Sequence, residues 1–207
     1  MKLFSKNHEM GGFTLIEMMV VISILAVLGS IFMNSGYSQN KIRNALLTDS
    51  EDLSITVSDM QNRTSSFVMQ NKVSDVVGYG VYIDTANASK IETFYKIKDS
   101  NFSSTEIASG RQTPDSDLIL TEGNHIGRIC LNGCSTKTVS QAVIYFVKPK
   151  TYSNVSFNDG SGYVSLFNNI SINHTCLEIA PPSGTDLRHV DIYYIGQVSS
   201  GFGPCQN

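Results

Sequence analysis

The sequence predicts an α+β fold in which one long N-terminal helix packs on an antiparallel β-sheet or sandwich. Residues 13–33 are apolar almost throughout, and the apolar residues that follow recur at nearly the spacing of an α-helix. After residue 72 the chain changes to short β-rich runs separated by Gly, Asn, Asp, Ser and Pro. This order of elements is that of a helix followed by an antiparallel sheet, and not of alternating βαβ units.

The apolar segment is long enough to cross a membrane as a helix. At about 1.5 Å per residue, the stretch from Phe13 to Met33 spans a hydrocarbon core of about 30 Å. Lys2 and Lys6 precede it and would stay on the cytoplasmic side. We therefore expect residues 13–34 to form a transmembrane half of the helix.

Glu17 is the unusual residue of this segment, because an ionised carboxylate in hydrocarbon costs several kcal/mol. A secretory signal peptide that is later removed would have a shorter apolar run, followed by a cleavage site of small residues. A plain membrane anchor would need no acid at all. Neither alternative explains Glu17 or the Gly11-Gly12 pair in front of the apolar run.

The amphipathic half of the helix is expected over residues 35–72. Gly36 makes the junction locally weak, since glycine costs about 1 kcal/mol relative to alanine in a helix. Asp49 and Ser50 interrupt the apolar stripe once. The stripe, which we expect to face the β-domain, consists of Ile42, Leu46, Leu53, Val57, Met60 and Phe67/Val68.

A β-rich globular domain is expected over residues 73–207. Alternation of apolar and polar residues is visible in several of its runs. The candidate strands are residues 76–84, 90–98, 117–121, 125–131, 141–148, 155–157, 170–180 and 188–199.

The charge balance argues against nucleic-acid binding. The chain has 15 basic and 18 acidic residues, a net charge of −3, and no run of Lys or Arg. Proteins that bind phosphate backbones normally present a basic field. Lys148, Lys150 and Arg188 are the only hints of a basic face.

The four cysteines predict two disulfides in an exported domain. Four cysteines allow three connectivities. We favour Cys130–Cys134, which closes a tight loop around "CLNGC", together with Cys176–Cys205, which ties down a segment that would otherwise fray. A zinc site with His125 or His174 is not favoured, because the C-x-x-x-C spacing differs from the usual pair and occurs once.

No catalytic or cofactor-binding constellation is found in the sequence. His125, His174 and His189 stand beside no recognisable motif and are expected to be strand or loop residues. "PDSD", with Asp115 and Asp117, and "NDGSG", with Asn158 and Asp159, lack the spacing of a calcium loop and are better explained as turns. We expect a protein that is not an enzyme and has no metal or cofactor.

The stretch "GGFTLIE" resembles the signal of type IV prepilins: a short basic leader that ends in Gly, an aromatic residue, and Glu as the fifth residue after the cut. The resemblance implies that residues 1–12 are a leader peptide and that cleavage falls between Gly12 and Phe13. It also implies that Phe13 is N-methylated and that Glu17 acts in assembly. The partners implied are a prepilin peptidase/methyltransferase, an inner-membrane assembly platform and other pilin subunits.

The order of elements is similar to that of minor pilins and pseudopilins, the group that includes type II secretion protein H. This similarity rests on the long helix, "GYGVYID" and the final "VDIYYIGQV". It implies a structural subunit of a type IV pilus or type II secretion-like filament, inserted once in the inner membrane of a prokaryote before assembly. Asn34 stands at the twenty-second mature position, where abundant pilins commonly carry proline. A major pilin, a DNA-binding minor pilin for natural transformation and a membrane-anchored adhesin remain alternatives.

Overall fold

A computed structural model describes residues 14–65, 76–97, 117–147, 150–158, 163–165, 173–183 and 186–206. The chain divides into two units, Met1–Lys41 and Ile42–Asn207, and each is described here by itself. Several expectations lie outside the described residues: Gly12, Phe13, the Phe67/Val68 end of the stripe, Asp115, and Asp159.

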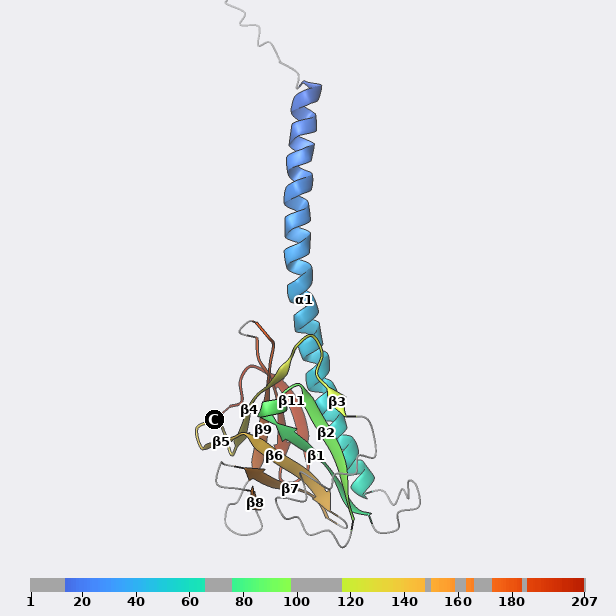
Figure 1. Cartoon of the computed structure of the whole chain (residues 1–207), viewed down its shortest axis with the longest axis vertical. Helices are drawn as coiled ribbons and strands as arrows, with labels where there is room; N and C mark the ends of the chain where they lie inside the picture. The colour runs from blue at the N-terminus through green and yellow to red at the C-terminus, as the bar shows by residue number, and fades with distance from the viewer. Residues whose placement is uncertain are drawn as a thin grey trace, which may run out of the picture. The chain divides into compact units, whose positions relative to one another are not determined.

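Helix α1 runs from Leu15 to Ser65 (Figure 1). Its backbone is helical through Gly36, where the sequence predicts a weak point. The predicted extension of the helix to about residue 71 falls on residues outside the described set. A helix of 51 residues gains most of its stability from packing, because isolated helices in water are marginal.

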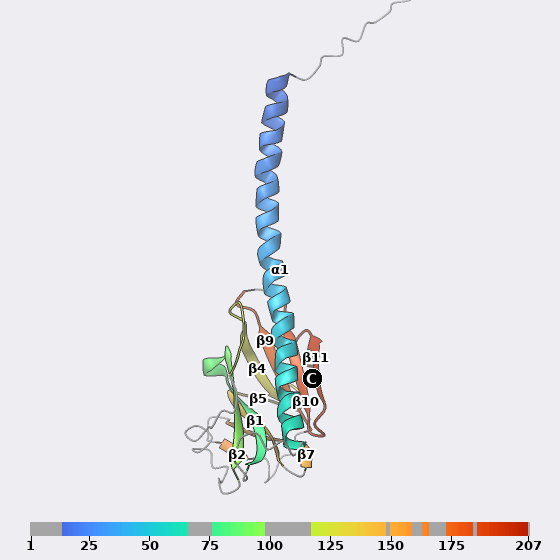
Figure 2. The same cartoon turned by 90° about the vertical axis from the view of Figure 1, so that its right-hand side faces the viewer.

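Eleven strands are described, and they form two antiparallel sheets beside the second half of α1 (Figures 1 and 2). The six-stranded sheet has the order β3-β2-β1-β6-β7-β8, and the five-stranded sheet the order β11-β10-β9-β4-β5. The predicted α+β class with an antiparallel sandwich is confirmed. The strands are β1 (Val76–Asp84), β2 (Lys90–Ile97), β3 (Leu118–Ile119), β4 (His125–Leu131), β5 (Lys137–Val139), β6 (Gln141–Val147), β7 (Lys150–Asn158), β8 (Tyr163–Ser165), β9 (His174–Ala180), β10 (Arg188–Tyr193) and β11 (Val198–Phe202), with a short 3-10 helix η1 (Thr85–Asn87) after β1.

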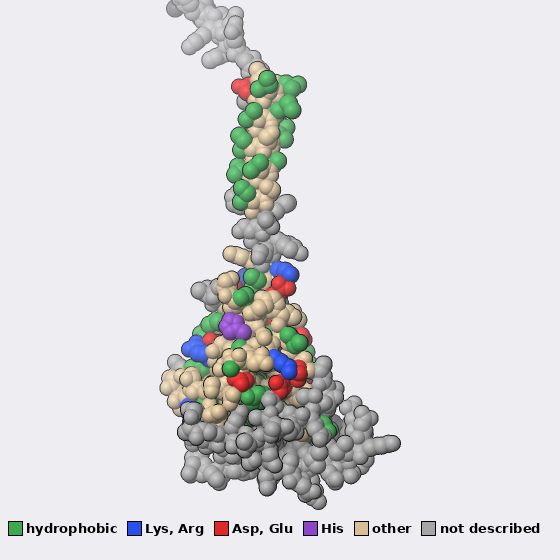
Figure 3. All heavy atoms as spheres, viewed as in Figure 1, with side chains coloured by type: hydrophobic (Ala, Val, Ile, Leu, Met, Phe, Trp, Pro, Cys, Tyr) green, Lys and Arg blue, Asp and Glu red, His purple; other side chains and the backbone are tan. Residues whose placement is uncertain are grey.

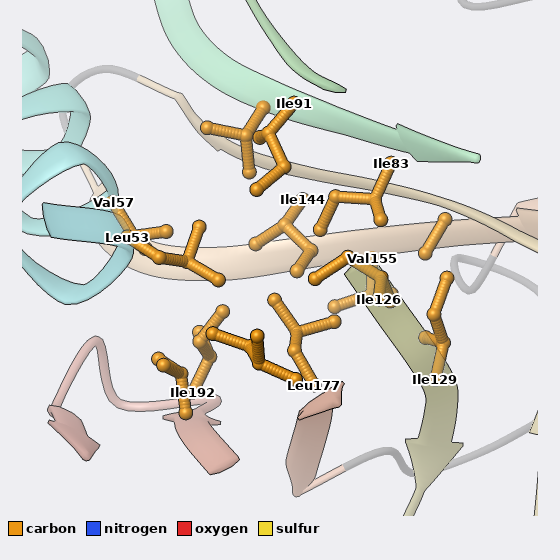
Figure 4. Close-up of a cluster of buried hydrophobic side chains, with 14 of the residues drawn as sticks. Leu53, Val57, Ile83, Ile91, Ile126, Ile129, Ile144, Val155, Leu177 and Ile192 are labelled. Atoms are coloured by element: carbon orange, nitrogen blue, oxygen red, sulfur yellow. The ribbon is translucent and has the colours of Figure 1, made fainter. Parts of the chain in front are cut away.

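The core lies between the two sheets and takes in one face of α1. Figure 4 shows Leu53 and Val57 of the helix directed toward side chains from strands of both sheets. Of the predicted apolar stripe, Leu46, Leu53, Val57 and Met60 are at most 2% exposed, and Ile42 is half-buried. Burial of each such side chain contributes about 2 kcal/mol to the free energy of folding.

Asp49 and Ser50, which interrupt the stripe, are also buried, at 1% and 0% exposed. The Asp49 carboxylate accepts hydrogen bonds from the Thr121 backbone N–H at 3.0 Å, from the Thr121 hydroxyl at 3.0 Å and from the Asn124 amide at 2.6 Å. The Ser50 hydroxyl donates to the Leu47 carbonyl at 2.8 Å. The interruption is thus a polar clamp inside the helix–sheet interface and not a gap in it.

The predicted strand over residues 188–199 is wrong, because this stretch is the β10–β11 hairpin. The Gly196 N–H donates to the Tyr193 carbonyl at 2.8 Å, and the Tyr193 N–H to the Gln197 carbonyl at 2.9 Å. Gly196 has φ +90°, a conformation that glycine adopts without a steric penalty. The glycine therefore reverses the chain inside an otherwise continuous apolar alternation.

Two of the strands, β5 and β8, are absent from the predicted set, and each has only three residues. Strand β7 begins at Lys150, five residues before the predicted start, and β3 is limited to Leu118–Ile119. After β3 the chain turns at once, with Glu122 and Gly123 at φ +51° and +77°. Short runs of this kind do not show the periodicity on which a strand prediction depends.

We predict that Asp49→Ala lowers the free energy of unfolding by about 3 kcal/mol, because it removes a charged acceptor and leaves the buried Asn124 amide without its partner. Near-UV circular dichroism of the tyrosines during urea unfolding of the full chain in detergent measures the change. The control is Asp52→Ala, an exposed acid on the same helix, for which a change of less than about 0.5 kcal/mol is expected. Equal effects of the two substitutions would contradict the clamp.

Candidate functional site at the start of helix α1

Glu17 and Thr14 form a reciprocal pair at the first turn of α1. The Thr14 backbone N–H and hydroxyl both donate to Glu17 Oε2 at 2.9 Å. In return the Glu17 backbone N–H donates to the Thr14 hydroxyl at 3.3 Å. This is the capping-box arrangement, in which the residue before the helix and the third helical residue satisfy each other's free N–H groups.

The signal for this cap is present in the sequence as Thr-Leu-Ile-Glu, the Ser/Thr-x-x-Glu pattern that precedes an apolar helix. The prediction from sequence assigns Glu17 to assembly and does not include its contact with Thr14. Both hydrogen bonds that the carboxylate accepts go to Oε2. Within the described residues, Oε1 has no hydrogen-bond partner, so one oxygen remains available to a group outside this helix.

Hydrophobic side chains stand along the described first part of α1 (Figure 3). Large apolar side chains from Leu15 to Ile31 are between 46% and 77% exposed within the chain. The hydroxyls of Ser23 and Ser30 donate to the Met19 and Val27 carbonyls, each at 2.8 Å. These serines use their hydroxyl protons inside the helix, whereas Glu17 keeps one carboxylate oxygen for a donor outside it.

The sequence predicts a transmembrane half of α1 over residues 13–34. Among the residues that the structure describes, no helix combines the length and the apolar composition that a membrane crossing requires.

The four cysteines, which are predicted to form two disulfides, lie together on the face of the five-stranded sheet that is turned away from the core. The disulfides are Cys130–Cys134 and Cys176–Cys205, which is the pairing that the sequence favours. We call this surface the disulfide face. Cys130 and Cys176 stand opposite each other on β4 and β9.

A buried acid supports the disulfide face. Glu178 is 4% exposed and binds Arg128 through two hydrogen bonds, at 2.9 and 2.8 Å, and the Cys205 N–H donates to it at 3.4 Å. The hydrogen bonds to Glu178, aided by its negative charge, raise the pKa of the Arg128 guanidinium. The Arg128 guanidinium therefore stays protonated at neutral pH, and the hydrogen bond from the Cys205 N–H to Glu178 holds the segment around Cys205 against β9.

The histidines occupy strand positions, as the sequence predicts. His174 Nε2 lies 2.7 Å from one oxygen of Asp191, and His189 Nε2 lies 3.5 Å from the other. Tyr193 stacks on His174 with ring centroids 5.0 Å apart. The sulfur of Cys176 lies near His174 and Asp191. It is bonded to Cys205 in a disulfide and is therefore not a free nucleophile for covalent catalysis.

Two groups of three potential metal ligands occur among the described residues. One is Cys130, Cys134 and Cys205, and the other is His174, Cys176 and Asp191. Every cysteine in the two groups is already part of a disulfide, and a disulfide sulfur is not the thiolate that binds zinc. Of the "PDSD" and "NDGSG" stretches the structure describes only Asp117 and Asn158. Asp117 pairs with Lys90 at 2.8 Å, and Asn158 donates to Gln141 at 3.0 Å.

The possible basic face of Lys148, Lys150 and Arg188 is not seen as an exposed surface among the residues that the structure describes. Arg188 is only 7% exposed. Lys148 and the side chain of Lys150 lie outside the described set.

Comparison with known proteins gives one match. Residues 10–33 match the prokaryotic N-terminal methylation motif. This motif contains Glu17 and the Gly12–Phe13 bond, and it supports the signal of type IV pilins and pseudopilins read in "GGFTLIE". It marks structural subunits and not an enzyme family. No curated protein and no solved structure matches the chain.

We predict that the two disulfides differ in their contribution to stability, because their loops differ in length. The separations are 29 residues for Cys176–Cys205 and 4 for Cys130–Cys134. From the entropy of loop closure, we expect replacement of Cys176 and Cys205 with serine to lower the free energy of unfolding by about 4 kcal/mol. The same replacement of Cys130 and Cys134 should lower it by about 2 kcal/mol. Urea unfolding of the two double variants measures the costs, and a larger loss for the Cys130/Cys134 variant would contradict this ranking.

Proposed function

We propose that this chain, which carries the type IV pilin and pseudopilin signal, is a minor pilin or pseudopilin of a type IV pilus or type II secretion-like filament. The observation that supports the proposal best is the methylation motif at residues 10–33, joined to a long helix on an antiparallel β-sandwich. In this proposal the protein performs no chemistry. Its work is done through contacts with other subunits.

The first proposed step is processing of the precursor. A prepilin peptidase cuts between Gly12 and Phe13, removes residues 1–12 and methylates the new amino group of Phe13. Residues 13–34 hold the processed chain in the inner membrane by their apolar side chains, while residues 73–207 fold outside the cytoplasm. Folding there agrees with the two disulfides, which persist in an oxidising compartment.

The second proposed step is assembly through Glu17. When helices of neighbouring subunits pack together, the ammonium group of Phe13 in one subunit meets the Glu17 carboxylate of the next. Each charge alone would be costly in apolar surroundings, and together they attract strongly. The free Oε1 of Glu17 supports this role, because the capping bonds occupy only Oε2.

A misaligned subunit would leave both charges unpaired, so the same contact sets the register of the growing filament. The partners in this mechanism are other pilin or pseudopilin subunits, the peptidase/methyltransferase and an inner-membrane assembly platform. Asn34, at a position where abundant pilins commonly have proline, favours a minor subunit over a major one. Measuring the number of copies of this protein relative to the other subunits in sheared filaments distinguishes a minor subunit from a major one.

We predict that the mature chain begins at Phe13 and carries one added methyl group. Intact-mass measurement of the membrane-extracted protein, with fragmentation of its amino end, tests this directly. Coexpression with an inactive prepilin peptidase is the control and should return the full precursor. A mature chain that still begins at Met1 would refute the proposed processing.

We predict that Glu17→Gln lowers the amount of protein incorporated into filaments by more than about tenfold, because it leaves the partner's ammonium group without a counter-charge. Glutamine still fits the capping box, so the helix start is kept. The matched variant Thr14→Ala removes the cap at a cost of about 1 kcal/mol but keeps the charge, and should still be incorporated. Quantifying the protein in sheared filament fractions measures both. If Glu17→Gln assembles normally, the charge-pair mechanism fails.

A further inference from the structure

A cavity of about 250 Å³ lies between α1 and the β10–β11 hairpin, within the unit that begins at Ile42. Arg43 and Leu46 line it from the helix, Arg188 from the start of β10, and Phe202 from the end of β11. Leu46 is buried at 2% exposed, whereas Phe202 is 71% exposed. The cavity therefore has an apolar inner wall, an aromatic ring at the surface, and cationic groups between them.

Arg188 is the unusual member of this lining. Its side chain is among the buried ones, at 7% exposed, and its guanidinium carbon lies 3.5 Å from the centre of the Phe202 ring. Among the residues that the structure describes, the guanidinium makes neither an ion pair nor a hydrogen bond. A guanidinium has five N–H donors. No Arg188 nitrogen is among the buried, partnerless polar atoms of the described residues, so these donors stay open to solvent at the cavity.

The neighbouring charges do not neutralise Arg188. Asp186 is the acid of the cavity lining, and its carboxylate lies 3.5 Å from Arg43 Nε. Both side chains of that pair are exposed, at 65% and 61%. The two arginines and the single aspartate thus leave one positive charge in excess, at the more buried arginine.

Arg128 shows what a satisfied arginine looks like in the same sheet. It is half exposed, yet it binds Glu178 through two hydrogen bonds of 2.9 and 2.8 Å. Arg188 is far more buried and has only the ring of Phe202. Stacking on an aromatic ring fixes the plane of a guanidinium and leaves its N–H edge free for a planar acceptor.

We propose that this cavity is a binding site for a carboxylate carried on a short apolar stem. The carboxylate accepts the N–H groups of Arg188, in the two-bond geometry that guanidinium and carboxylate share, and the stem lies against Leu46 and Phe202. Two sources present this chemistry: an acidic side chain of a neighbouring filament subunit, which rests on the proposed function, or a free short-chain acid. Aromatic residues, phenylalanine among them, and arginine are both enriched at protein–protein interfaces.

The test uses propionate as the probe and the full chain in detergent micelles. Propionate is titrated while the arginine Nε–H resonances are followed by NMR, with propionamide as an uncharged molecule of the same shape. We expect a saturable shift of the Arg188 resonance with propionate and none with propionamide. Equal responses to the two probes, or no response to propionate, would overturn the proposal.

Variants locate the effect at the cavity. Arg188→Gln should weaken propionate binding by at least tenfold. Binding is measured as the rise in melting temperature of the protein when propionate is added. The matched control Arg63→Gln removes an arginine of α1 that does not line the cavity, and should bind as the wild type does. Should Arg188→Gln not fold, Phe202→Leu at the exposed rim serves instead and should weaken binding. Unchanged binding in the folded cavity variants would overturn the proposal.

A further arm distinguishes the two sources. Phe202 is replaced by the photo-reactive p-benzoylphenylalanine, which keeps an aromatic ring, and assembled filaments are irradiated. A cross-link to an Asp- or Glu-containing peptide of another subunit identifies the subunit source. Propionate binding without such a cross-link identifies the free acid. Because the propionate titration needs no filament, its failure is separate from failure of the proposed assembly role.

Discussion

The contact of Asp49 with the segment between β3 and β4 is the constraint on which the sandwich depends. Strand β3 belongs to the six-stranded sheet and β4 to the five-stranded sheet, so the residues between them cross from one sheet to the other. Asp49 holds this crossing through Thr121 and Asn124. One side chain of α1 thereby fixes the register of the helix and the joint between the sheets together.

Apolar packing alone would not fix that register. The stripe of Leu46, Leu53, Val57 and Met60 would tolerate small shifts along the helix axis, because dispersion contacts are not directional. Hydrogen bonds to a buried carboxylate are directional, and a displaced helix would leave charged oxygens without donors. The polar clamp therefore supplies the specificity, and the apolar stripe supplies most of the free energy.

The sequence was sufficient for the features that depend on local pattern, and insufficient for those that depend on distant partners. The helix stripe, the antiparallel class and the core strands follow from periodicity, and the structure contains them. The role of Asp49 did not follow, because its partners are 72 and 75 residues away along the chain. The β10–β11 turn was missed because its apolar alternation continues across Gly196. The Thr14–Glu17 cap, by contrast, is encoded locally in the Thr-x-x-Glu pattern at the start of the helix.

The crowding of sulfur atoms on the disulfide face has a consequence for oxidative maturation. The Sγ atoms of Cys130, Cys134 and Cys205 lie within 4.8 Å of one another, and Cys176 is bonded to Cys205. Exchange proceeds by attack of a thiolate on a disulfide sulfur within reach, so a partly oxidised chain can also close wrong pairs. Efficient biogenesis of this protein should accordingly depend on an isomerase that reshuffles mispaired intermediates, and not only on an oxidant.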